Sequence, residues 1–352
     1  MSALLFSTKL FPFLCLLVAS WECKLLNTTG EDIWQSDTII NSNNQIHQYA
    51  DIFIAGAINN FNNYSNAAYW KNGKEIILSN DHSFANDILV NEGDVFVGGT
   101  INGKPCYWVN GKCVIISKDD GFVSAIKFHK GNLYMVGLYH DSLTDIYYAF
   151  LWENNVFTIL GNGYASVTDI AFDNNDIYIA GIDEGKPCYW ENQVKIMLSD
   201  HVGIVNGIEI ANNDVLSAGE FAPEDNEYYL TGYWKNKEFI SVGNNSAYIW
   251  NVSFNKDKIY LVGSQIMDKD SLIDQAILIE DKVKTVLSVP DNVSAVALNI
   301  DFNKGDKYII GNCITSTKPV LSSQVCYWLN NKIYIIGRPG SVCSAIHIEP
   351  VL

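Results

Sequence analysis

One short unit is repeated seven times along this chain of 352 residues. Each copy has a strand-like run that ends in Gly, such as Asp94–Gly99, and then a Trp-turn-strand hairpin, such as Tyr107–Lys112. A period of about 40 to 45 residues with several short strands per unit is typical of a β-propeller. The repeated glycines are Gly56, Gly99, Gly137, Gly181, Gly219, Gly263 and Gly311.

Each unit has enough strand-like runs for one four-stranded blade. A short apolar run such as Asn86–Val90 is followed by a polar turn, the Gly-ended strand, the Trp strand and an apolar last strand such as Val114–Ile116. An Asn-Gly-like pair separates the last two strands, because a tight hairpin requires positive φ and these residues tolerate it. The Trp position holds Trp70, Trp108, Trp152, Trp190, Trp234, Ile279 and Trp328. The sequence therefore predicts an all-β, seven-bladed propeller of antiparallel blades.

The first-strand pattern occurs once more at the C-terminus, in Cys343–Ile348. We expect this strand to join residues 51–79 in one composite blade, because such a splice closes the ring and removes a sheet edge. The Trp row could also be a set of sugar platforms. One Trp per blade, on a strand with neighbours on both faces, instead favours packing. Ile279 supports packing, since an apolar residue is sufficient there.

The first twenty residues have the pattern of a secretory signal peptide, with one Lys, a short apolar run and small residues near Ser20. The apolar run is short for a membrane span, although an anchor stays an alternative. Cys23 raises the alternative of a lipoprotein, but Trp21 and Glu22 fit such a site poorly. We expect a signal peptide (1–20), an N-terminal segment of unclear role (21–43) and one propeller domain (44–352). The expected location is secreted, periplasmic or at the cell surface.

Composition limits the partners. The chain is 48% hydrophobic and only 18% charged, which suits a large core, and its net charge is −16. Phosphate backbones and anionic lipid surfaces require a basic face, so a nucleic-acid partner is not expected. No segment after the start is long and apolar enough to predict an integral membrane protein.

The cysteines permit disulfides without specifying them. Eight are present, and Cys15 would leave with the signal peptide, so an odd number remains. Cys106 and Cys113 are diagonal neighbours across one hairpin, while Cys313 and Cys326 lie on consecutive strands. Either pair is compatible with export, and buried thiols are the other interpretation. No spacing of Cys and His fits a zinc site.

The topology separates the connections between strands into two faces. The turn face holds the short, uniform turns between the first and second and between the third and fourth strands. The variable-loop face holds the other connections, of which five between second and third strands are long. These five span residues 59–64, 139–145, 221–229, 267–274 and 314–319. Their mixture of aromatics, carboxylates and amides suits recognition on a rigid scaffold, with solvated loops as the alternative.

Nine residues are candidates for ligand binding. The variable-loop face supplies Tyr139, His140, Tyr228, His82 and His201. If the first strand is innermost, Asp87, Asp169, Asn251 and Asn299 surround the mouth of the central channel. Carboxylates and amides gathered there could bind a polar ligand or a cation such as calcium, with ordered water as the alternative. No cofactor or metal site is predicted.

Catalytic motifs are not found. The chain has no Gly-x-Ser-x-Gly, phosphate-binding Walker loop or His-Glu-x-x-His pattern. His82 and His201 each follow an Asp, but adjacency in sequence does not create the geometry of a triad. No catalytic residue is therefore assigned.

The Tyr-Trp-Lys-Asn-Gly-Lys and Val/Ile-Tyr-Ile-Ala-Gly units resemble the repeats of secreted, largely uncharacterised bacterial β-propeller proteins, over roughly residues 44–348. The resemblance implies the fold and offers no catalytic motif. The leading hypothesis is an exported recognition module that binds a protein or glycan through the variable-loop face. A secreted hydrolase or lyase acting at the channel mouth and a purely structural surface protein are the alternatives.

Overall fold

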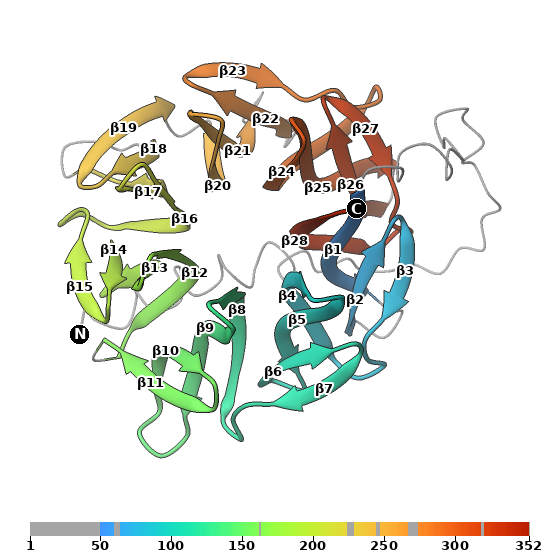
Figure 1. The fold of residues 1–352 in the computed structure, drawn as a ribbon. Helices are drawn as coiled ribbons and strands as arrows, with labels where there is room; N and C mark the ends of the chain where they lie inside the picture. Colours follow the sequence, from blue (N-terminus) through green and yellow to red (C-terminus); the bar gives the residue numbers. More distant parts are fainter. Residues whose placement is uncertain are drawn as a thin grey trace.

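The computed structural model describes residues 50–351, apart from 60–63, 162, 224–228, 244–246, 267–273 and 318–319. The regular elements of this part are all β-strands, which form seven four-stranded antiparallel sheets around a ring (Figure 1). The predicted seven-bladed propeller is confirmed. None of the described residues belongs to a helix that is long and apolar enough to cross a membrane. The predicted signal peptide and N-terminal segment lie outside the described residues.

Each blade has an inner, a second, a third and an outer strand. The inner strands are β4 (Ser83–Asn91), β8 (Asp120–His129), β12 (Ala165–Asp173), β16 (Gly203–Ala211), β20 (Ala247–Asn255), β24 (Val293–Asn303) and β28 (Ser341–Pro350). The second strands are β1 (Ala50–Asn59), β5 (Asp94–Ile101), β9 (Asn132–Asp141), β13 (Asp176–Asp183), β17 (Asp214–Phe221), β21 (Lys258–Ile266) and β25 (Asp306–Thr317).

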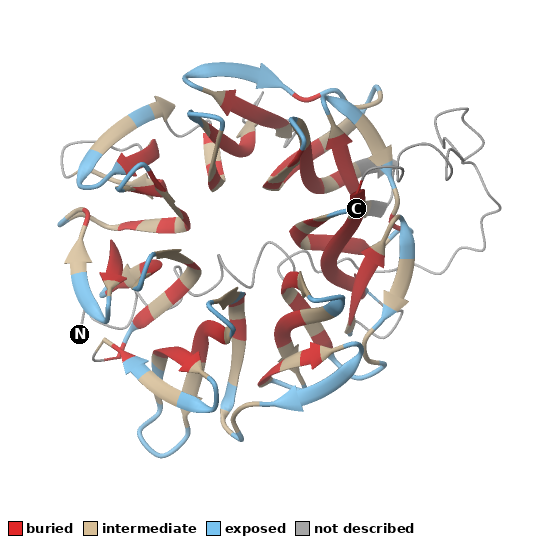
Figure 2. Cartoon of the chain, in the orientation of Figure 1, coloured by how far each residue is buried: buried red, intermediate tan, exposed pale blue. Residues whose placement is uncertain are grey.

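The two remaining sets lie farther from the ring axis. The third strands are β2 (Ser65–Lys71), β6 (Lys104–Val109), β10 (Ile146–Glu153), β14 (Lys186–Glu191), β18 (Leu230–Lys235), β22 (Asp274–Glu280) and β26 (Val320–Leu329). The outer strands are β3 (Lys74–Ile77), β7 (Lys112–Ile115), β11 (Val156–Leu160), β15 (Val194–Met197), β19 (Glu238–Gly243), β23 (Val283–Val286) and β27 (Lys332–Ile335). Figure 2 shows that burial is concentrated in the inner three strands, while outer strands such as β7 and β23 are exposed.

The ring closes through the C-terminal strand. The first blade has the order β28-β1-β2-β3, and Ile54 of β1 pairs with Ile346 of β28. The predicted composite blade is thus confirmed. Because β1 and β28, the first and last strands of the described residues, hydrogen-bond in one sheet, opening the ring requires breaking a complete strand pairing.

The core is a ring of seven hydrophobic clusters, each shared by two neighbouring blades. Trp108 of the second blade packs with Phe53 and Ala55 of the first, and Trp190 packs with residues of the blade before it. The six tryptophans and Ile279 are all buried. The Trp row is therefore packing, as predicted, and Ile279 fills the same position in the sixth blade.

The repeated glycines are explained by a β-bulge in each inner strand. At Gly99, the pairing of β4 with β5 shifts by one residue, and a Cβ would lie 2.0 Å from the carbonyl oxygen of Phe84. The other six repeated glycines face a backbone carbonyl of the inner strand at 1.9 to 2.1 Å in the same way. Only Gly fits at such an approach, since any side chain would displace the bulge.

The turn face is built by one repeated device. Asn110, at a φ of 49°, donates from Nδ2 to Asp94 and accepts the N–H of Val95 on its own Oδ1. Equivalent Asn–Asp pairs occur at Asn72–Asp51, Asn192–Asp176, Asn236–Asp214 and Asn330–Asp306. In the sixth blade Asp281 occupies the Asn position and accepts the N–H of Ile259. The position that holds Asp in these Asn–Asp pairs holds Lys258 here, which avoids repulsion between two carboxylates. The uniformity of these turns is therefore structural.

Each expected loop overlaps a flanking strand, and two of them overlap it by more than one residue. Tyr139 and His140 belong to β9, which continues to Asp141, so only residues 142–145 form the connection. Residues 314–317 belong to β25, and Thr317 pairs with Val320 across the hairpin. The β-branched residue types of this segment favour extended backbone, which the reading of 314–319 as a loop did not take into account.

Candidate functional site

The inner strands contact one another through the polar residue at the bulge. Asn86 donates from Nδ2 to the carbonyl oxygen of Val123 in the next blade at 2.7 Å. The same contact to the next blade is made by Ser124, Thr168, Asn206 and Ser344. Five successive blade boundaries, which join six blades, are thus each crossed by a hydrogen bond from the bulge residue of an inner strand.

Asp87 follows this bulge position, and both of its carboxylate oxygens are occupied. Oδ1 accepts the N–H of Ile88, and Oδ2 accepts the N–H of Ile126 in the next blade, each at 2.8 Å. The side chain is buried, and burial raises the pKa of the carboxyl despite the nearby Lys127. Asp87 therefore joins two blades rather than presenting a carboxylate to a ligand.

Asp169 repeats the arrangement two blades later. Its Oδ1 accepts the N–H of Ile170 at 2.8 Å, and its Oδ2 accepts the N–H of Ile208 in the following blade at 3.1 Å. Burial raises the pKa of this carboxyl to about 6. At the same strand position Asn299 accepts the N–H of Ile300, and Asn251 lies against Gly207 of the preceding blade. The structure thus places all four predicted residues around the ring axis.

A group of charged side chains two residues farther along the inner strands was missed by sequence reasoning. Lys127 of β8 is solvent-accessible, yet carboxylates of four other blades raise the pKa of its ammonium, foremost that of Asp87. Only a side chain that reaches toward the ring axis can be influenced from so many blades. We call Asp87, Lys127, Asp169, Glu209, Asp301 and His347 the axial cluster.

The remaining carboxylates of the axial cluster also accept backbone hydrogen bonds. Asp301 accepts the N–H groups of Phe302 and, across the seam, Ile348. Glu209 accepts the N–H of Ile210 at 3.1 Å, and burial raises its pKa to about 7. The cluster thus supplies acceptors to the inner strands and gathers four carboxyl groups around one ammonium. Within the described residues, no three His, Cys, Asp or Glu side chains are arranged to hold a metal ion.

Sequence reasoning named Asp87 and Asp169 but missed the other four residues of the axial cluster, because residue types at their strand position differ between blades. The equivalent positions hold Leu89, Lys127, Ala171, Glu209, Ser253, Asp301 and His347. A repeated motif cannot reveal such a site. The signal that could have revealed it is the presence of charged residues at a position where inner strands otherwise carry small or apolar ones.

The variable-loop face carries the other predicted residues, each beside an aromatic ring. The ring of His82 lies 5.4 Å from that of Tyr64, and the ring of His201 lies 6.1 Å from that of Phe221. The centroid of the Tyr139 ring lies 5.5 Å from that of Tyr148. These three ring pairs belong to different blades or blade junctions. Tyr228 lies outside the described residues.

The β9–β10 turn is the best-defined connection on this face. Asp141 organises it by accepting the N–H of Leu143 and the hydroxyl of Thr144, which lower the pKa of its carboxyl. His140 Nε2 lies 2.9 Å from Asp145 Oδ1, and its ring lies 4.4 Å from that of Tyr147. Leu143 at the tip is 95% exposed. The turn is therefore ordered internally while presenting an apolar side chain to solvent.

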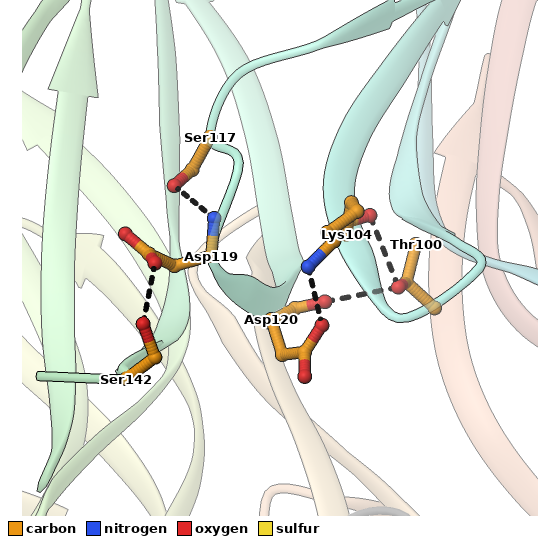
Figure 3. Close-up of polar contacts among 7 residues, drawn as sticks. Thr100, Lys104, Ser117, Asp119, Asp120 and Ser142 are labelled. Carbon is orange, nitrogen blue, oxygen red and sulfur yellow. Dashed lines mark hydrogen bonds and ion pairs between the residues drawn. The ribbon is translucent and has the colours of Figure 1, made fainter. Parts of the chain in front are cut away.

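Polar contacts support this turn from the neighbouring blade (Figure 3). The hydroxyl of Ser142 donates to Asp119, which lies between the second and third blades. On the other side of that junction Lys104 pairs with Asp120 at 2.7 Å. The loops of adjacent blades thus hold one another in place, as a preformed binding surface requires.

All exposed aromatic side chains of the described residues lie on the variable-loop face. They are Tyr64, Tyr147, Tyr164 and Tyr229. The exposed aliphatic side chains, such as Val194 and Val283, lie mostly on outer strands instead. Tyrosine is enriched at protein interfaces because it offers a large, rigid apolar surface together with a hydroxyl group.

Tyr164 departs from ordinary backbone geometry. It is 74% exposed and has a φ of 61°, in the region that favours Gly and Asn. Its N–H donates to the carbonyl oxygen of Tyr147, which places the two side chains on one part of the face. A Tyr at this φ carries more backbone strain than Gly or Asn would at the same position.

A carboxyl with a raised pKa lies between the fifth and sixth blades on the same face. Burial raises the pKa of Glu220 to about 7, against the effect of a hydrogen bond with Thr231. Burial also raises the pKa of Asp274, and both carboxyls are near Tyr248. Sequence reasoning missed Glu220, although it is the only charged residue directly after a repeated Gly.

Comparison with known proteins leaves the family open. No protein-family model matches the chain, and the search of curated proteins gave no match. Similar solved structures include TolB from Acinetobacter baumannii, at 10% identity and a TM-score of 0.45, covering 84% of this chain and 66% of that one. Kuenenia stuttgartiensis hydrazine synthase has 11% identity and a TM-score of 0.46, with 86% and 47% covered. The chain thus spans about half to two thirds of these two proteins.

A third similar structure is the Trypanosoma rangeli sialidase in complex with sialic acid. It has 9% identity and a TM-score of 0.38, with 82% of each chain covered. Sequence identity this low is not a basis for carrying an activity from one propeller to another, because one fold serves many functions.

Proposed function

We propose that this protein is an exported recognition module that binds a protein partner through its variable-loop face. The observation that carries the proposal is the gathering of Tyr64, Tyr147, Tyr164 and Tyr229 on that face. Large exposed aromatics are the usual anchors of protein interfaces. The Asn and Asp side chains of the repeated turns on the turn face are occupied by hydrogen bonds within their own blades.

The spread of the tyrosines favours a protein over a small glycan. Tyr64 belongs to the first blade, Tyr147 to the third and Tyr229 to the fifth. A partner that contacts all three must extend across much of the ring, and a specific protein interface covers about 800 Å² per partner. The fully exposed Leu143 adds an apolar contact of the kind that a protein surface covers.

A hydrolytic site at the channel mouth is supported less well. Catalysis requires a carboxylate that can reach the substrate, whereas both oxygens of Asp87 and of Asp169 accept backbone hydrogen bonds, one from the same strand and one from the next blade. These residues contribute instead to the rigidity of the scaffold on which the recognition face is built.

The test compares two double variants of the full-length protein. Tyr147→Ser with Tyr164→Asn removes two aromatic side chains from the variable-loop face. Val156→Ser with Val194→Ser removes two exposed side chains from outer strands and is the matched control. Each immobilised protein is exposed to a cell-envelope protein extract and, in parallel, to a glycan array. We expect specific proteins to bind the wild type and the control and to be lost from the tyrosine variant.

Two results would count against the proposal. Equal capture by both double variants would mean that the partner uses another face. Binding to defined glycans, with no protein retained, would mean that the partner class is wrong. Melting temperatures of all variants establish that a loss of binding does not come from unfolding.

A further inference from the structure

Three buried cysteines gather where the seventh blade meets the seam of the ring. Cys313 lies on β25, Cys326 on β26 and Cys343 on the closing strand β28. Cys313 Sγ is 2.9 Å from Cys326 Sγ. The thiols of Cys326 and Cys343 both point to the carbonyl oxygen of Gly311, at 3.3 and 3.1 Å.

We propose that Cys313 and Cys326 form a disulfide in the exported protein, while Cys343 stays a thiol. The two residues lie on hydrogen-bonded strands, where Cys326 pairs with Gly311 and Cys313 pairs with Gln324. They are therefore diagonal neighbours on one face of the sheet. An S–S bond is about 2.05 Å long, so a movement of less than about 1 Å closes it.

The hydrogen bonds around Gly311 explain why the third cysteine remains reduced. In the reduced protein Cys313 donates to Cys326, and Cys326 donates to the Gly311 carbonyl. Oxidation removes both of these donors. If Cys343 stays reduced, its thiol continues to donate to the same carbonyl oxygen, so that oxygen keeps one thiol donor after oxidation.

The reaction is a thiol–disulfide exchange with a small-molecule disulfide or a protein dithiol oxidase of the oxidising compartment. One protein thiolate attacks the external disulfide and forms a mixed disulfide, and the second protein thiol then displaces the external thiol. Two protein thiols and one external disulfide give one protein disulfide and two external thiols, so the two electrons and two protons pass to the oxidant.

Burial determines when the bond forms. The thiolate is the attacking species, and burial raises the pKa of the Cys326 thiol well above its ordinary value. Exchange in the folded ring is therefore slow. The hairpin that carries both cysteines closes only twelve intervening residues, so the pair can meet before the seventh blade packs against the seam.

The disulfide would cross-link the middle of the β25–β26 strand pair. It would also hold the strand pair that packs directly against β28, which closes the ring. The bond itself does not depend on what the variable-loop face binds.

The test is peptide mapping of the full-length protein, which is refolded with glutathione disulfide and then alkylated with iodoacetamide in denaturant, without reductant, so that the reagent reaches buried thiols. We expect a linked peptide that contains Cys313 and Cys326, which disappears after reduction, together with alkylated Cys343. Cys326→Ser should leave Cys313 alkylated. The matched control is Cys188→Ser, which removes a buried cysteine at the same repeat position, before Tyr-Trp, and should leave the link intact.

The melting temperature gives a second measurement. Reduction should lower it by several degrees in the wild type and in Cys188→Ser, and leave it unchanged in Cys326→Ser. Complete alkylation of Cys313 and Cys326 in the oxidised wild type would overturn the proposal, as would a link from either residue to Cys343. The wild-type map decides the question even if a variant does not fold.

Discussion

The carboxylate of Asp87 accepts the backbone N–H of Ile126 across a blade boundary at 2.8 Å. The bulge in β4 is what turns this side chain toward the neighbouring inner strand, and the same bulge excludes a side chain at Gly99. One irregularity of the inner strand therefore explains the repeated glycine and the contact between blades.

Replacing Asp87 tests whether it is structural. Asp87→Ala leaves the buried N–H groups of Ile88 and Ile126 without their acceptor, and each unsatisfied group costs about 1–3 kcal/mol. We expect the free energy of unfolding, measured by urea denaturation, to fall by about 2–4 kcal/mol. Asp87→Asn retains one acceptor oxygen and should lose less. A change below about 0.5 kcal/mol for Asp87→Ala would instead support a carboxylate that is available to a ligand.

The axial cluster predicts a pH dependence of stability. The pKa of Glu209 is raised to about 7 in the folded protein, so the folded state holds this proton more tightly than the unfolded chain does. The contribution is fully present below the unfolded pKa of about 4.3 and is lost as pH rises through about 7. Glu209→Gln removes the titration. We therefore expect its melting temperature, relative to that of the wild type, to rise from pH 5 to pH 8.

Calorimetry at the two pH values measures this difference, with Glu238→Gln on the exposed start of β19 as the control. Carboxyls with lowered pKa values, such as Glu280, change their charge below this window and do not contribute within it. A difference between Glu209→Gln and wild type that does not vary with pH would contradict the burial of Glu209 around the ring axis.

The close approach at the repeated glycines predicts two different costs for the same substitution. Gly99→Ala places a Cβ against the Phe84 carbonyl oxygen and should destabilise the protein by about 3 kcal/mol or more. In Gly111→Ala, the added Cβ has no atom within 4 Å. The substitution should therefore lower the free energy of unfolding by only about 1 kcal/mol, which is the cost of placing Ala at a φ of +80°. Denaturant unfolding of both variants checks the order. Equal losses would mean that the bulge can relax.

Sequence alone predicted the parts of this protein that repeat. The seven glycines, the Trp row and the extra strand at Cys343–Ile348 predict the number of blades and the position of the seam. They do so because every blade has the same bulge and packs against its neighbours in the same way. The functions of Asp87 and Lys127 could not be predicted in this way. The first depends on a bulge that shifts register by one residue, and the second on side chains from other blades that meet near the ring axis.

We expect replacement of Tyr164 to have opposite effects on stability and on binding. Asn occupies positive φ at lower cost than Tyr, and the Tyr ring is mostly exposed, so Tyr164→Asn should raise the free energy of unfolding by up to about 1 kcal/mol. The same change removes an anchor of the variable-loop face and should weaken partner capture. Tyr164→Phe keeps the ring and should retain most of the binding. A stability loss in Tyr164→Asn would show that the ring contributes to packing and would remove the argument for a strained residue held for recognition.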